Sequence, residues 1–136
     1  MKQNKLSVQI SKPVAEVFEF TINPANTPHW IEHLEVEETN EWPPKRGTIY
    51  KNRGALGTWS EYVVSAFEPN KTFEMVDKDG NYHVRYTYKE VDSGRTEMEY
   101  FEWVDRGELE QPFTQNILEK LKSVLESVDH VKKDKK

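Results

Sequence analysis

Three consecutive β-hairpins in the second half of the chain have registers that the sequence itself defines. The middle hairpin turns at Asp79-Gly80, a dipeptide that suits a two-residue loop because both turn positions need positive φ. Pairing outward from this turn produces an apolar face and a charged face, and the charged face gains a favourable opposite-charge pair. The predicted neighbours are Met75–Val84 and Phe73–Tyr86 on the apolar face and Glu74–Arg85 on the charged face.

The two flanking hairpins assign the faces in the same way. Turns at Asp92-Ser93-Gly94 and Pro69-Asn70 predict the pairs Tyr88–Met98, Tyr86–Tyr100, Lys89–Glu97, Ala66–Phe73 and Val64–Met75. A slip by one residue would move one strand's apolar set to the charged face, so the agreement supports this register. The inner face is therefore predicted to carry Tyr62, Val64, Ala66, Phe73, Met75, Tyr82, Val84, Tyr86, Tyr88, Met98 and Tyr100.

The first part of the chain is typical of one strand followed by two short helices. Apolar and polar residues alternate over residues 6–10, which indicates a strand. Ser11 is expected to cap the first helix, with Pro13 in its first turn, where a missing N–H costs little. The second short helix is expected over residues 24–31, after the break at Asn23-Pro24.

Two further strands and one long helix complete the pattern. Strands are expected at residues 34–38 and 48–53, but the hairpin around residues 54–57 has an open register because three-, four- and five-residue loops all fit. The helix should begin near Pro112, and residues 132–136 should form a charged, frayed tail. Its apolar stripe is predicted to be Phe113, Ile117, Leu121, Val124 and Val128, flanked by Leu118 and Leu125.

Composition limits the classes of function. The chain has 136 residues, no cysteine and a net charge of −5. The length fits one domain, assigned to residues 1–131, and the lack of cysteine excludes disulfides, thiolate catalysis and cysteine-ligated zinc. The negative charge argues against nucleic-acid binding. No segment is long enough to span a membrane and no apolar signal region is evident, so a cytoplasmic location is expected.

Several segments in this order are similar to one known superfamily. They are residues 10–18, Asn23-Pro24, Trp30, Gly47, and residues 63–69, 95–98 and 121–126. Together they resemble the START-like superfamily, also called the helix-grip or birch-pollen-allergen fold, and within it the polyketide cyclase/dehydrase-like (SRPBCC) branch. The resemblance implies an α+β helix-grip fold, in which a curved antiparallel sheet of about six to seven strands wraps around a long C-terminal helix.

The favoured interpretation is a domain that binds a small, largely apolar molecule, such as a lipid, an isoprenoid or an aromatic polyketide. Five tyrosines share the predicted inner face, and buried phenols need hydrogen-bonding partners, which a cavity holding water or ligand would provide. The pocket is expected between the sheet and the C-terminal helix. Its predicted lining is Trp30, Tyr62, Val64, Phe73, Met75, Val84, Tyr86, Tyr88, Met98, Tyr100, Phe113, Ile117 and Leu121.

Two alternatives stay open, both of which the resemblance implies. The first is an enzyme of the polyketide cyclase, aromatase or dehydratase type, in which Glu102, with inner-face parity, would be the candidate acid or base. The second is a protein-interaction module of the chaperone-activator kind, or a homodimer. It would use outer-face aromatic residues, namely Trp59, Phe67, Phe101 and Trp103.

No cofactor or metal site is expected. His29 and His33 have the spacing of half a metal site, yet no third ligand is evident in the sequence.

Overall fold

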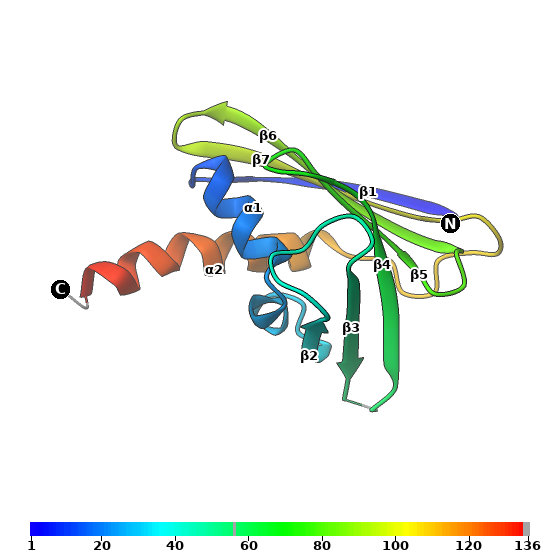
Figure 1. Cartoon of the computed structure of the whole chain (residues 1–136). Helices are drawn as coiled ribbons and strands as arrows, with labels where there is room; N and C mark the ends of the chain where they lie inside the picture. Colours follow the sequence, from blue (N-terminus) through cyan, green and yellow to red (C-terminus); the bar gives the residue numbers. More distant parts are fainter. Residues whose placement is uncertain (56, 135–136) are drawn as a thin grey trace.

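The computed structural model describes residues 1–55 and 57–134, with side chains described up to residue 127. Figure 1 shows an α+β architecture in which strands dominate and a long helix follows the last strand. The elements in chain order are β1 (Gln3–Ile10), α1 (Val14–Ile22), the 3₁₀ helix η1 (Pro24–His29), β2 (Leu34–Thr39), β3 (Ile49–Gly54), β4 (Trp59–Glu68), β5 (Thr72–Asp77), β6 (Tyr82–Asp92), β7 (Arg95–Val104) and α2 (Gln115–Asp134).

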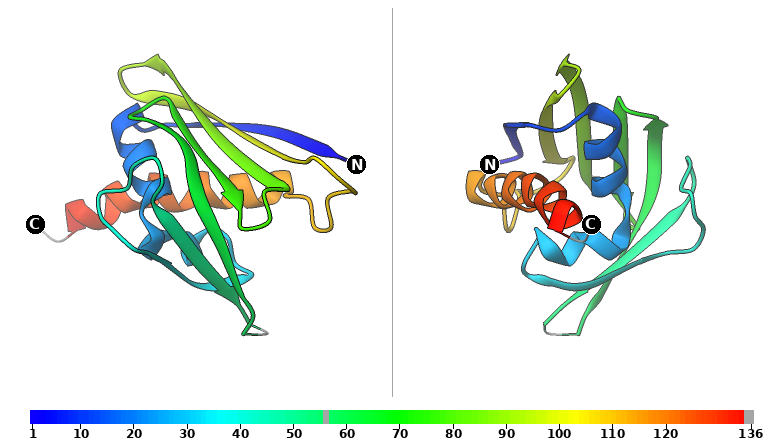
Figure 2. Two further views of the ribbon diagram at one scale, coloured as in Figure 1. Left: turned by 45° about the vertical axis from the view of Figure 1, so that its right-hand side comes forward. Right: turned by 90° about the vertical axis from the view of Figure 1, so that its left-hand side faces the viewer.

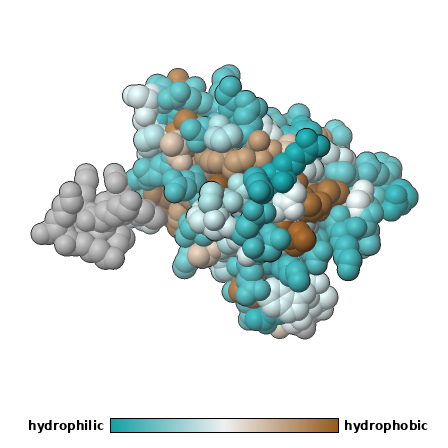
Figure 3. Space-filling model, in the orientation of Figure 1, coloured by the Kyte–Doolittle hydropathy of each residue, from teal (hydrophilic) through white to brown (hydrophobic). Residues whose placement is uncertain are grey.

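The seven strands form one antiparallel sheet in the order β1-β7-β6-β5-β4-β3-β2. The sheet curls into a half-barrel, and the helices lie on its concave side, as the two views of Figure 2 show. This arrangement confirms the predicted helix-grip fold. No helix in the described part of the chain has the length and apolar character needed to cross a bilayer. In the view of Figure 3 the surface is mostly hydrophilic, with smaller hydrophobic areas among the polar residues.

The registers of the last two hairpins are confirmed. The observed pairs include Phe73–Tyr86, Met75–Val84, Tyr86–Tyr100, Tyr88–Met98, Lys89–Glu97 and Val84–Glu102. On the outer face Arg85 Nε lies 2.7 Å from a carboxylate oxygen of Glu74, which is the predicted opposite-charge pair. The registers are therefore correct, but the expected turn at Asp79-Gly80 is wrong: Gly80 has a positive φ and Asp79 does not, and the Gly80 N–H donates to the Asp77 carbonyl at 2.9 Å.

One predicted pair in the β4–β5 hairpin is wrong. Val64 faces Met75 as expected, but a β-bulge follows, so that Ala66 pairs with Glu74 and Phe67 with Phe73. The extra residue reverses the parity of the strand end. Phe67 consequently turns inward, where its ring packs 5.6 Å from Phe18 and 6.2 Å from Phe73, and it does not belong to the outer-face aromatic group.

The open β3–β4 register is defined by the structure. The last pair before the connection is Arg53–Trp59, which leaves residues 54–58 between the strands, the longest of the loops that the sequence allowed. Part of this connection, residue 56, lies outside the described residues.

The first helix begins differently from the prediction. Pro13 is the N-cap of α1 and makes no side-chain capping bond, so Ser11 is not the cap. The backbone N–H of Ser11 instead donates to a carboxylate oxygen of Glu126 on α2, at 2.9 Å.

The long helix starts at Gln115, three residues after Pro112. Its most buried side chains are Leu118, Leu121 and Leu125, at 0–1% exposure, whereas Ile117 and Val124 are half-buried. The buried face of α2 is therefore centred on Leu121 and the two leucines that were predicted only to flank the stripe. Phe113 precedes the helix and is not part of this face. The side chain of Val128 lies outside the described residues, and the helix includes part of the expected tail 132–136, up to Asp134.

Leu121 provides a test of this packing. The side chain is fully buried against the core, so Leu121→Ala should lower the free energy of unfolding by about 2–5 kcal/mol. Val124→Ala, at a half-buried position on the same helix, is the control and should cost less. Urea unfolding followed by circular dichroism measures both. Equal costs for the two variants would contradict the observed orientation of α2.

Candidate ligand-binding cavity

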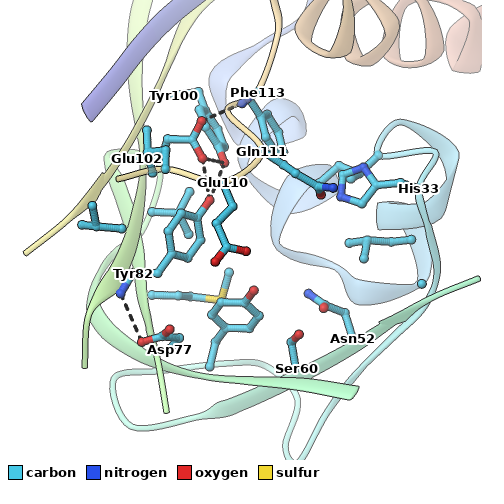
Figure 4. A pocket seen from close by; sticks show the side chains of 18 of the residues that line it. His33, Asn52, Ser60, Asp77, Tyr82, Tyr100, Glu102, Glu110, Gln111 and Phe113 are labelled. Atoms are coloured by element: carbon cyan, nitrogen blue, oxygen red, sulfur yellow. Dashed lines mark hydrogen bonds between the residues drawn. The ribbon is translucent and has the colours of Figure 1, made fainter. Parts of the chain in front are cut away.

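The concave face of the sheet holds a cavity of about 870 Å³, within the size range of small-molecule sites. Its lining comes from strands β2 to β7, from residues that include Ile31 and His33 between η1 and β2, and from the connection between β7 and α2. The cavity reaches the surface at exposed residues such as Thr58, Asp79 and Glu110. Figure 4 shows polar side chains from these different segments facing the same space.

The predicted lining residues divide into two groups. Those that line the cavity are Tyr62, Phe73, Met75, Val84, Tyr86, Tyr100 and Phe113. Those that do not line it are Trp30, Val64, Tyr88, Met98, Ile117 and Leu121, and of these all but Ile117 are nearly or fully buried. The lining residues outside the strands and their hairpin loops come from the β7–α2 connection, from the segment around η1 and from Thr21 of α1. The described part of α2 contributes no lining residue.

The tyrosine hydroxyls are mostly satisfied within the protein. Tyr50 donates to the Ile22 carbonyl at 2.6 Å, and the Tyr88 hydroxyl lies 2.5 Å from that of Thr21. Burial raises the pKa of the inner phenols above the ordinary value, so they are neutral at physiological pH. The affected residues are Tyr50, Tyr62, Tyr82, Tyr86, Tyr88 and Tyr100.

Tyr86 is an exception among these phenols. Its side chain is 6% exposed and lines the cavity, and none of the hydrogen bonds among the described residues involves its hydroxyl. The ring is held on three sides, by Phe73, Tyr100 and Trp30, at centroid distances of 5.8, 5.6 and 6.1 Å. The phenol is thus rigidly placed, and its hydroxyl is available to a molecule in the cavity.

Glu102 faces inward, as its parity predicted, and is 1% exposed. Its carboxylate accepts four hydrogen bonds: from the Tyr82 hydroxyl (2.6 Å), the Tyr100 hydroxyl (3.4 Å), the Asn4 amide (2.9 Å) and the Phe113 backbone N–H (2.7 Å). Three of these bonds are dashed in Figure 4. The carboxylate joins β1, β6, β7 and the end of the β7–α2 connection, and its acceptor sites are taken.

Glu37 is a second carboxylate in the cavity, and the sequence analysis did not identify it. The Thr27 hydroxyl donates to one oxygen at 2.6 Å and the Asn52 amide to the other at 3.2 Å. The side chain is enclosed by protein and reaches solvent only partly, and this burial raises its pKa despite the two hydrogen bonds. β2 and β3 pair with a bulge between Leu34 and Val36, so the orientation of Glu37 could not be deduced from alternation.

The raised pKa of Glu37 predicts a pH-dependent stability. A raised pKa in the folded state means that the protonated form stabilises the fold below the unfolded pKa, and that this contribution is lost as pH rises through the folded pKa. Glu37→Gln stays neutral, so at pH 7 it should be at least as stable as the natural protein, and the gain should disappear at about pH 4.

The matched control is Glu35→Gln, which changes an exposed carboxylate on the same strand. Urea unfolding of the three proteins at both pH values provides the measurement. A Glu37→Gln variant that loses stability only at pH 7 would contradict the assignment of Glu37 as a desolvated carboxyl.

The outer face retains part of the predicted aromatic group. Phe101 and Trp103 stack at 4.8 Å, and the Arg85 guanidinium lies 5.8 and 5.1 Å from their ring centroids. Trp59 is separate, 48% exposed, and has the Arg53 guanidinium 5.4 Å from its ring. The outer-face aromatic group therefore lacks Phe67, and the guanidinium groups of Arg85 and Arg53 lie over its remaining rings.

Metal ligands do not gather in the described residues: no three His, Cys, Asp or Glu side chains there are placed to hold one ion. His33 lines the cavity, but His29 does not. The polar groups among the lining residues are phenols, amides, hydroxyls and carboxylates, together with the His33 imidazole and the Arg106 guanidinium.

The fold and this cavity define a START-like domain, and the comparisons identify the family. A family model described as polyketide cyclase / dehydrase and lipid transport matches residues 1–128. The chain belongs to this family. Comparison with curated proteins finds no match.

Solved structures share the fold at low sequence identity. Protein MLL2253 from Mesorhizobium loti has a TM-score of 0.73 at 18% identity, covering 92% of this chain and 97% of that one. A START superfamily protein from Mycobacterium smegmatis has a TM-score of 0.70 at 10% identity, covering 94% and 99%. The Aha1 dimer from Colwellia psychrerythraea has a TM-score of 0.66 at 13% identity, covering 93% and 96%. At these identities the likeness concerns the fold.

Proposed function

We propose that this protein binds a small molecule with a largely apolar body in the cavity on the concave face of the sheet. The observation that carries the proposal is a cavity of about 870 Å³ whose wall contains a rigid phenol, Tyr86, without a protein partner. A hydroxyl at the cavity wall without a protein partner is available to hydrogen-bond with a molecule in the cavity. The family description, which includes lipid transport, supports the same function.

The shape of the lining supports an apolar body for the ligand. Aromatic rings and the side chains of Met75 and Val84 line the cavity, and edge-to-face or tilted ring contacts hold the rings. Such a wall favours flat or isoprenoid-like molecules, because burying apolar surface contributes about 25 cal/mol per Å². Polar side chains among the lining residues would orient the molecule.

The two alternatives have less support. The cyclase, aromatase or dehydratase hypothesis relied on Glu102, whose carboxylate is occupied by four protein donors and therefore serves a structural role. The interaction-module hypothesis relied on the outer aromatic residues. Phe67 has turned inward, and Phe101 and Trp103 pack with Arg85.

A neutral aromatic dye provides the test of binding. We expect N-phenylnaphthylamine to bind with a Kd of roughly micromolar order, with increased fluorescence and a higher melting temperature of the protein. Val84→Phe narrows the cavity and should weaken binding, whereas the outer-face change Trp103→Ala should leave it unchanged. The melting temperature of each variant without dye shows that it folds. The proposal would be contradicted if Val84→Phe and Trp103→Ala weakened dye binding equally, or if the dye did not bind the natural protein.

A further inference from the structure

We propose that the ligand of this cavity carries a positively charged nitrogen, and that Glu37 and Tyr86 recognise this group while the aromatic wall holds the apolar body. The inference rests on the proposed function and specifies its ligand class: a cationic amphiphile in preference to a neutral or anionic one. Four independent features of the lining lead to it, namely free acceptor sites, an unpaired phenol, net charge and aromatic faces.

Free acceptor sites distinguish Glu37 from Glu102. A carboxylate offers about four lone-pair positions. Protein donors fill four positions on Glu102, but only two on Glu37, those from Thr27 and Asn52. Glu37 lines the cavity, so its remaining positions can accept hydrogen bonds from a bound molecule. The ligand group beside Glu37 must therefore be a hydrogen-bond donor.

Tyr86 is the second group with unused hydrogen-bonding capacity. Its hydroxyl lacks a partner among the described residues, and the charge of Glu37 is close enough to raise its pKa further. In addition to burial, which is the larger cause, the same charge raises the pKa of Tyr50 and Tyr62, so these phenols stay neutral as well. A neutral phenol can accept a hydrogen bond from a donor-rich group, and an ammonium has up to three donors to share between Tyr86 and Glu37, which line the same cavity.

The charge of the lining favours a cation over a neutral donor. Acidic residues lining the cavity are Glu37, Asp77, Asp79, Glu102, Glu108 and Glu110, whereas Arg106 is the only Lys or Arg among the lining residues. The N-terminal ammonium offsets Glu108, at 2.6 Å. Figure 4 shows Asp77 and Glu110 facing the same space as Glu102. A cleft with low-dielectric walls and one sign of charge attracts ligands of the opposite sign.

Glu37 lacks a cationic partner of its own. In the part of the chain that the structure describes, no Lys, Arg or His forms an ion pair with it, and burial makes its ionised form costly. A ligand ammonium would supply the missing charge and would favour the ionised carboxylate. A ligand carboxylate at the same place would instead add a second negative charge to a desolvated site.

Aromatic rings complete the site. Phe73 and several inner tyrosines line the cavity, and the negative face of an aromatic ring attracts a cation placed near it. Charge-assisted hydrogen bonds are also stronger than neutral ones. An aromatic wall that includes a buried carboxylate without a cationic partner is therefore the chemistry that favours an amine with an apolar body.

The test compares three probes with the same ring system and different head groups: naphthylmethylamine, naphthylmethanol and naphthoate. Isothermal titration at pH 7 should give about tenfold tighter binding of the amine than of the alcohol, which corresponds to about 1.4 kcal/mol, and the weakest binding for the carboxylate. The common ring system keeps the apolar contribution constant, so differences report on the head group.

Three variants locate the recognition. Glu37→Gln should reduce amine affinity to that of the alcohol and leave the alcohol unchanged, whereas Glu35→Gln, with the same change of net charge on the same strand, should alter neither. Tyr86→Phe, which removes only the hydroxyl, should weaken the amine by a few-fold. Melting temperatures without probe establish that each variant is folded.

The outcomes separate this inference from the proposed function. If the amine and the alcohol bind the natural protein equally, or if naphthoate binds best, the inference is overturned and the binding function stands. If the preference for the amine survives Glu37→Gln, the role of Glu37 is overturned. If none of the three probes binds, both proposals fail.

Discussion

A seven-stranded sheet that curls around one long helix presents more concave surface than that helix can cover. α2 lies along β1, and its leucines Leu118, Leu121 and Leu125 fill the core on that side. The inner faces of β4, β5 and β6 extend beyond its reach, and the aromatic residues there face the cavity of about 870 Å³. The cavity thus follows from the geometry of the fold, while its chemistry follows from the individual side chains.

Two carboxylates at the cavity differ in how many protein hydrogen-bond donors they have. Glu102 accepts hydrogen bonds from four donors on different segments and thereby holds the β7–α2 connection against the sheet. Glu37 has two donors and no cationic partner among the described residues, and burial raises its pKa. A carboxylate such as Glu102, whose hydrogen bonds all come from the protein, stabilises the fold. A carboxylate such as Glu37, with acceptor positions left over, can gain further hydrogen bonds from a ligand.

The sequence predicted the fold and the aromatic half of the site because turn residues and strict alternation define the β5–β6–β7 register. It did not predict the bulge after Val64, since no residue type there signals an extra residue in the strand. Glu37 was missed for a related reason: β2 contains its own bulge, and the loop before β4 allowed three lengths. Phe113 was placed in α2, but its N–H is held by Glu102 on the sheet.

The central claim, that the concave cavity binds the ligand, can be tested most directly by nuclear magnetic resonance of methyl-labelled methionine. The chain has three methionines: Met75 lines the cavity, Met98 is fully buried away from it, and Met1 is exposed. On titration with naphthylmethylamine the account predicts a saturable shift of the Met75 methyl signal, with Met98 and Met1 little changed. Saturable binding that leaves the Met75 signal unmoved would contradict the account.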